Sequence, residues 1–200
     1  LRLPSMTKRQ LVGSAAFFTA LFGVLAFLFA QDAGRFAKLL QKSKVSLQQA
    51  AEIGQRASPD AKLFHVELEQ DGARVVYSVD LALGTKSVNV LVDATTGQVV
   101  EKVDEDEDHS REVDSSRVTL LTAVASGLSR VPGTAVEAEM VVDGGQPRVN
   151  VSIVAGDTVS QVAIDGVTGK PLEGSRARGS GKAEPSPFTT YFHLDKGELG

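Results

Sequence analysis

The chain of 200 residues contains no cysteine, no tryptophan and only three histidines. Without cysteine it has no disulfide framework, Cys-ligated zinc site, iron–sulfur cluster or thiol nucleophile. His65, His109 and His193 are too scattered to show the spacing of metal ligands. The sequence also lacks a G-x-S-x-G, an H-E-x-x-H, a phosphate-binding loop and a dinucleotide fingerprint. We therefore expect a protein that is not an enzyme and has no catalytic residues, cofactor or metal ion.

Positive charge is scarce in the middle of the chain. Residues 1–44 carry seven Lys and Arg against one Asp, whereas residues 45–173 carry ten against 21 Asp and Glu. An acidic middle excludes nucleic acid as a partner, because phosphate binding requires a basic surface. The basic N-terminal flank suits the anionic headgroups of membrane lipid.

One long apolar run is present, at residues 11–30 (LVGSAAFFTALFGVLAFLFA), and it carries no charge. As a helix it would be about 30 Å long, the thickness of a bilayer's hydrocarbon core. We expect an uncleaved, single-pass transmembrane helix that holds the soluble part outside the cytoplasm at the inner membrane. The alternative is a cleaved signal peptide after Lys8 and Arg9, although the apolar region of a signal peptide usually has about 7–15 residues.

Small residues recur along this run at helical spacing. Such spacing lets a second transmembrane helix approach closely, which predicts a packing face for an integral membrane protein. The alternative is that alanine and glycine are simply frequent in membrane helices. The predicted helix-packing face consists of Ala15, Thr19, Gly23 and Ala26.

Residues 31–44 place apolar side chains at helical spacing among basic ones. We expect a short basic amphipathic helix that lies near the headgroups or forms a stalk.

The acidic middle contains one pattern twice, in residues 45–101 and 118–173. Pro59 aligns with Pro132, and Asp93 with Asp165. Each copy predicts a capped helix and then antiparallel strands with one buried face. We expect strands at residues 63–70, 74–81, 87–92 and 98–101, and at 135–142, 148–154, 160–164 and 170–173. The fold class is α+β: an N-terminal transmembrane helix followed by two helix-plus-antiparallel-sheet repeats. His65, in an alternating strand, is expected to be a half-exposed surface residue.

The last hairpin of each copy has a common motif, VLVDATTGQV at residues 90–99 and VAIDGVTGKP at residues 162–171. The first copy resembles the PepSY family, whose last hairpin reads V-x-V-D-A-x-T-G-x-V. The second copy departs from it at Gly166 and Pro171. We interpret the shared aspartates and glycines as residues of tight turns. These structural-turn residues are Asp93, Gly97, Asp165 and Gly169.

The PepSY resemblance implies a helix packed on an antiparallel sheet in each copy, hence a tandem PepSY protein. It also implies an extracytoplasmic or membrane-associated module that binds or inhibits, as in peptidase propeptides. The family has no catalytic residues to carry over.

Two segments lie outside the repeats. Residues 102–117 contain five adjacent carboxylates, which lack the spacing and glycine of a calcium loop and predict a solvated acidic linker. Residues 174–200 are rich in Gly, Ser and Pro before an aromatic cluster, which predicts a flexible tail that docks on a partner or, alternatively, a strand that folds back on the second repeat. The docking residues would be Phe188, Tyr191, Phe192 and Leu194.

These expectations describe a non-catalytic, membrane-anchored, periplasmic binding protein. We expect an accessory or scaffolding subunit of a respiratory, photosynthetic or transport complex, bound to integral membrane proteins through the transmembrane helix and the tail. The alternative is a module that regulates a peptidase by inhibition or as a chaperone. The chain divides into residues 1–10, 11–30, 31–44, 45–101, 102–117, 118–173 and 174–200.

Overall fold

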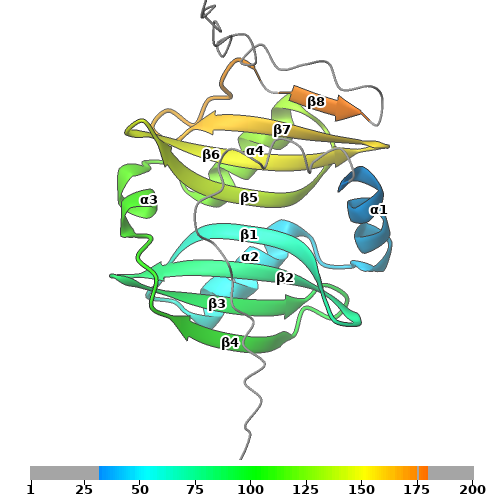
Figure 1. Ribbon diagram of the computed structural model, residues 1–200, viewed down its shortest axis with the longest axis horizontal. Coiled ribbons are helices and arrows are strands. Elements are labelled where there is room, and N and C mark those ends of the chain that lie inside the picture. The colour runs from blue at the N-terminus through cyan, green and yellow to red at the C-terminus, as the bar shows by residue number, and fades with distance from the viewer. Residues whose placement is uncertain (1–31, 175, 180–200) are drawn as a thin grey trace, which may run out of the picture.

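The computed structural model describes residues 32–174 and 176–179. Eight strands of these residues form one antiparallel sheet, in the order β4-β3-β2-β1-β5-β6-β7-β8 (Figure 1). The strands of the first half are β1 (Lys62–Asp71), β2 (Arg74–Leu83), β3 (Lys86–Asp93) and β4 (Val99–Glu105). Those of the second half are β5 (Thr134–Asp143), β6 (Gln146–Ala155), β7 (Thr158–Asp165) and β8 (Arg176–Gly179).

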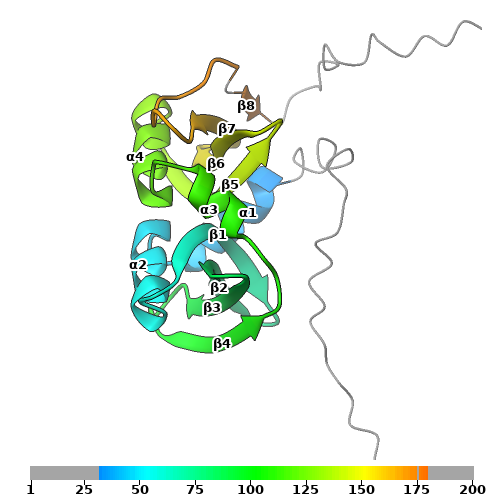
Figure 2. The ribbon, with the colours of Figure 1, turned by 90° about the vertical axis from the view of Figure 1, so that its left-hand side faces the viewer.

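Two helices of equal length cover one face of this sheet. They are α2 (Leu47–Ala57) and α4 (Leu120–Arg130), each packed on the strands that follow it, and they lie on the same side (Figure 2). Ser46 caps α2 in a capping box with Gln49, and Thr119 caps α4. We call α2 with β1–β4 the first unit and α4 with β5–β8 the second unit.

The two units join edge to edge, through β1 and β5, rather than face to face. We call this pairing the seam. Its register joins His65 to Glu139, Val66 to Ala138 and Glu67 to Glu137. Two further helices, α1 (Asp32–Lys42) and α3 (Ser110–Ser115), lie at its two ends, where β1 and β5 diverge (Figure 1).

The apolar core lies between the sheet and its helices. Strand residues alternate between this core and the other face, so Val66, Val79, Val90 and Val151 are fully buried. The polar residues between the buried ones are therefore directed to the face opposite α2 and α4. On the core side, Gly54 brings α2 very close to the sheet, since a Cβ at this position would lie 2.5 Å from Cγ1 of Val79.

The α+β class is confirmed, but three expected segments differ. Residues 102–117 connect the two units and are mostly exposed, but they contain regular structure, because Lys102–Glu105 complete β4 and residues 110–115 form α3. The expected strand at 170–173 is reduced to a single bridge between Pro171 and Ile164, since proline has no N–H to donate to a ladder. Its place beside β7 is taken by β8, within the segment expected to be a flexible tail.

The segment 31–44 contains the expected amphipathic helix, α1, but its apolar side packs on the protein. Phe36 and Leu39 are only 2% and 4% exposed and belong to the main core. Burial in the fold leaves these two side chains unavailable to lipid, so α1 does not form a free stalk. Its position near the headgroups stays a prediction.

No helix within residues 32–174 and 176–179 is long and apolar enough to cross a membrane. The predicted transmembrane run at 11–30, with its packing face at Ala15, Thr19, Gly23 and Ala26, lies outside the described residues. The predicted docking residues, Phe188, Tyr191, Phe192 and Leu194, also lie outside them.

Candidate functional site

Two rows of polar side chains cross the centre of the sheet on the face opposite α2 and α4. They follow the register of successive strands, so each residue lies beside its neighbour in the row. The first row, from β3 to β6, consists of Asn89, Asp80, His65, Glu139 and Asn150, and the second, from β2 to β6, of Ser78, Glu67, Glu137 and Ser152.

His65 is held firmly within the first row. Its Nδ1 lies 2.7 Å from Oδ2 of Asp80, and the two side chains are 14% and 16% exposed. Asp80 accepts a second hydrogen bond from Asn89, at 2.5 Å. Burial lowers the pKa of His65, but the hydrogen bond and charge of Asp80, together with the glutamates of β5, raise it to about 9.

Glu67 and Glu137 lie opposite each other in the second row. Glu137 accepts a hydrogen bond from the Ser152 hydroxyl at 2.8 Å. Arg35 of α1 reaches Glu67, with Nη2 3.5 Å from Oε1. Burial and then the charge of Glu137 raise the pKa of Glu67 to about 7. Both effects disfavour a second negative charge at the seam.

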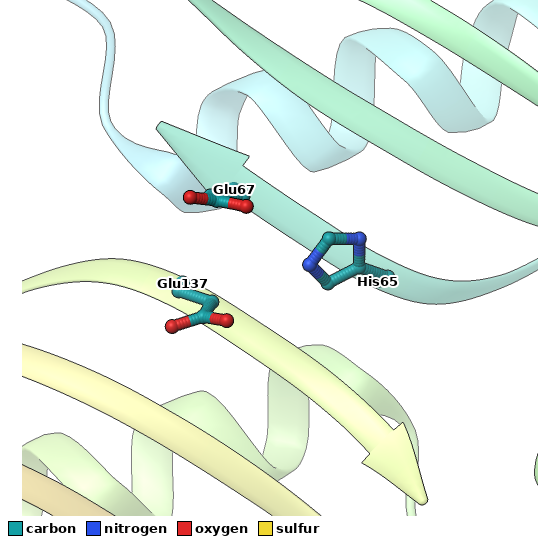
Figure 3. Close-up of side chains that lie close together, drawn as sticks. All are labelled: His65, Glu67 and Glu137. Atoms are coloured by element: carbon teal, nitrogen blue, oxygen red, sulfur yellow. The ribbon is translucent and has the colours of Figure 1, made fainter. Parts of the chain in front are cut away.

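His65, Glu67 and Glu137 converge (Figure 3). One potential ligand atom from each lies within 4.8 Å of the other two. In Figure 3 one ring nitrogen points toward the two glutamates. Because Nδ1 is bound to Asp80, this nitrogen is Nε2. The cluster combines an imidazole nitrogen with two carboxylates from both units, a donor set that can bind a cation.

The helix α3 covers one end of the same face. Its N-cap residue His109 stacks on Phe64 with ring centroids 4.1 Å apart, and Asp114 accepts a hydrogen bond from Lys62 at 2.7 Å. Oε2 of Glu112 is buried and has no hydrogen-bond partner among the described residues. These contacts fix the connection between the two units against β1.

The four predicted turn residues are not members of this cluster and lie in two equivalent turns. Oδ1 of Asp93 accepts hydrogen bonds from the backbone of Thr95 and Thr96, and Oδ1 of Asp165 does the same for residues 167 and 168. Gly97 and Gly169 have φ angles of +73° and +70°. The carbonyls of residues 94 and 166 in these turns accept hydrogen bonds from the segments that enter α2 and α4. Their role in the structure is to hold each helix to its hairpin.

Sequence reasoning missed the cluster. His65 was expected to be half exposed, and this is wrong, since Asp80 and the seam cover it. The signal that could have found it is the alternation of β1, which places His65, Glu67 and Glu69 on one face. In β5 the same alternation places Glu137 and Glu139 together.

The strand β4 forms one edge of the sheet and is open on its outer side within the described residues. Nearly all of it is exposed, and Val99, Val100 and Val103 are 44%, 37% and 41% exposed. Lys102 of this strand donates a hydrogen bond to the carbonyl of Ala57 at the end of α2.

The first unit corresponds to a known family. Residues 44–103 match the model described as "Peptidase propeptide and YPEB domain", PepSY. This segment is a PepSY domain. The match runs from the entry to α2 as far as the middle of β4, so it includes Val99, Val100 and Val103. A second PepSY domain over the second unit stays a prediction. The PepSY domain fits a non-catalytic module.

Comparisons with complete proteins add little. No curated protein matches the chain. Among solved structures, a lipoprotein from Clostridium difficile 630 is 20% identical with a TM-score of 0.42, covering 70% of this chain and 97% of that chain. The YpmB protein from Bacillus subtilis is 17% identical with a TM-score of 0.28, covering 62% and 93%. Both likenesses are too distant to support an argument about function.

Proposed function

We propose that the protein is a non-catalytic, membrane-anchored, extracytoplasmic binding protein that serves as an accessory subunit of a larger membrane complex. The observation that carries this proposal is the open edge of the PepSY domain. A partner in extended conformation would add a strand to β4 and cover its exposed valines. The uncharged apolar run at residues 11–30 supports the membrane anchor.

The edge is suited to strand addition for two reasons. First, a strand of seven residues offers backbone donors and acceptors together with the apolar side chains of Val99, Val100 and Val103. Second, it carries Glu101, Asp104 and Glu105 against one lysine. The negative charge discourages two copies of β4 from pairing with each other and favours a basic segment.

The test is to extract the full chain from its membrane in mild detergent and to identify co-migrating proteins by native electrophoresis and mass spectrometry. Wild type should migrate in a complex. Val103→Lys places a positive charge on the edge, so it should reduce the recovered partner about tenfold or more. Val167→Lys is the matched control, because Val167 is equally exposed, at 42%, but lies in a turn of the second unit. Recovery of wild type as a monomer alone would refute the proposal.

A second candidate is regulation of a peptidase. It is supported by the description of the matched family as a peptidase propeptide. The full chain in detergent should then slow an extracytoplasmic peptidase of the same cell. Val103→Lys should abolish the inhibition if β4 is the contact, and unchanged peptidase rates at saturating protein would exclude this role.

A further inference from the structure

We propose that His65, Glu67 and Glu137 bind a divalent transition-metal ion, with Zn²⁺ as the first expectation, and that this ion links the two units across the seam. The inference does not depend on the accessory-subunit role, because it concerns the junction inside the chain rather than the β4 edge.

The three side chains leave space for an ion among them. Their ligand atoms lie within 4.8 Å of one another, yet His65 donates no hydrogen bond to either glutamate in the described part of the chain. Zinc binds nitrogen and carboxylate oxygen at about 2.0–2.2 Å, so tetrahedral ligands are about 3.3–3.6 Å apart. The side chains are therefore separated enough to admit an ion and need only a small inward movement to bind it.

Neighbouring strands hold His65 and Glu137 in place. Asp80 of β2 binds Nδ1 of His65 and directs Nε2 toward the glutamates. Ser152 of β6 donates to Oε2 of Glu137, and within the described part of the chain Oε1 has no hydrogen bond that would compete with a ligand bond. Metal-binding histidines almost always donate their second ring N–H to a carboxylate or carbonyl, and ligand carboxylates are themselves hydrogen-bonded. The cluster has both features.

Two carboxylates placed together at the seam carry an energetic cost. Like charges directly opposite each other in neighbouring strands are destabilising, and here they are also partly buried. His65 and Arg35 are the cations beside Glu67, but the Arg35 side chain is 47% exposed and 3.5 Å away, so solvent screens its charge. A bound dication would neutralise both carboxylates and take the place of the proton on Nε2 of His65, which is released to solvent.

The position of the cluster indicates what such an ion would do. The seam has three register pairs, whereas β1 and β2 share nine. His65 and Glu67 belong to the first unit and Glu137 to the second, so one ion would connect them at this short pairing. Binding to a folded site that the unfolded chain lacks stabilises the fold.

The test uses the untagged full chain in detergent, stripped with EDTA and dialysed. Isothermal titration with Zn²⁺ should show one saturable site per chain, and the midpoint of thermal unfolding should rise with added metal. His65→Gln and Glu137→Gln should each weaken the affinity at least tenfold and remove the thermal shift. Asp80→Asn should weaken it about 10–100-fold, as expected for a partner that orients a ligand.

Glu69→Gln is the matched control, because Glu69 lies on the same face of β1 outside the cluster. It should bind Zn²⁺ as wild type does. Circular dichroism of each metal-stripped variant checks its folding. Glu67→Gln is a further ligand variant, in which the repulsion between the carboxylates of Glu67 and Glu137 is also removed. The proposal is overturned if wild type shows no saturable site, or if Glu69→Gln loses as much affinity as Glu137→Gln.

Discussion

Glu67 of β1 and Glu137 of β5 are register partners across the seam, so two carboxylates face each other where the two units meet. Sheets usually place opposite charges or apolar pairs at such positions. Here the pair lies on the face opposite α2 and α4, away from the apolar core. The arrangement makes the junction sensitive to the charge of both residues.

The first prediction concerns the pH dependence of the metal-free protein. The pKa of Glu67 is raised from 4.5 to about 7 by burial, by Glu137 and by Glu69, against the opposing charges of His65 and Arg35. The folded state therefore holds a proton that the unfolded chain releases. The resulting stabilisation is complete below pH 4.5 and is lost as the pH rises through about 7.

Glu67→Gln stays neutral at every pH and should reveal this loss. At pH 8, in EDTA, it should be more stable than wild type by about 1–3 kcal/mol, because a shift of one pKa unit corresponds to about 1.4 kcal/mol. At pH 4.5 the two proteins should be nearly equal. Urea unfolding followed by circular dichroism measures both. A difference that is the same at the two pH values would contradict the assignment.

The second prediction concerns the close contact of α2 with the sheet. A Cβ at Gly54 would lie 2.5 Å from Cγ1 and 2.9 Å from Cβ of Val79, which is fully buried and cannot retreat. Gly54→Ala should destabilise the fold by about 1–3 kcal/mol. Gly34→Ala in α1 meets nothing within 4 Å and should stabilise by about 0.5–1 kcal/mol through helix propensity. Equal effects in thermal unfolding would refute the packing argument.

Much of the fold could be predicted from local patterns. The caps Ser46 and Thr119, the D-x-x-T-G turns and the alternation of apolar residues depend on neighbours in sequence, and the structure places helices and strands close to the expected ranges. The end of β4 was hidden because Lys102–Glu105 are nearly all charged. Charged residues are common both in exposed edge strands and in solvated linkers, so composition alone does not separate the two.

The candidate site was beyond this reasoning for a different reason. Alternation places His65 and Glu67 on one face, but Glu137 becomes their neighbour only through the β1–β5 register. That pairing joins segments that no hairpin connects, so no turn sets it. The hydrogen bond from His65 to Asp80 likewise depends on a bulge between Leu63 and His65, and the alternation of residues in β1 does not predict this bulge.

The third prediction concerns α1. Phe36 and Leu39 pack into the main core, so α1 should be part of the cooperative fold. Phe36→Ala should cost about 3–5 kcal/mol and should expose the helix to trypsin at Lys38 and Lys42. Gln41→Ala, at an exposed position of the same helix, should change neither property. If Phe36→Ala left the unfolding midpoint unchanged, α1 would be independent of the body.

The fourth prediction concerns the turn at Asp93, whose Oδ1 accepts hydrogen bonds from the backbone of Thr96 at 2.8 Å and of Thr95 at 2.9 Å. These bonds, that of Thr96 first, hold the pKa of Asp93 below its usual 3.8. The stabilisation is therefore present above pH 3.8 and is lost as the pH falls through the lowered value. Asp93→Ala removes the acceptor and should cost about 1–2 kcal/mol at pH 7.

Asp93→Asn keeps an oxygen in place without the charge, so it should cost less than Asp93→Ala at pH 7. It should also lack the loss of stability at low pH that protonation of Asp93 causes. Acid titration of both variants, followed by circular dichroism, measures this loss. The two variants together separate hydrogen bonding from charge. The amides of Lys44 and Val45 donate to the Ala94 carbonyl in this turn. If Asp93→Asn were as destabilising as Asp93→Ala, the charge of the carboxylate rather than its acceptor geometry would hold the turn in place for these contacts.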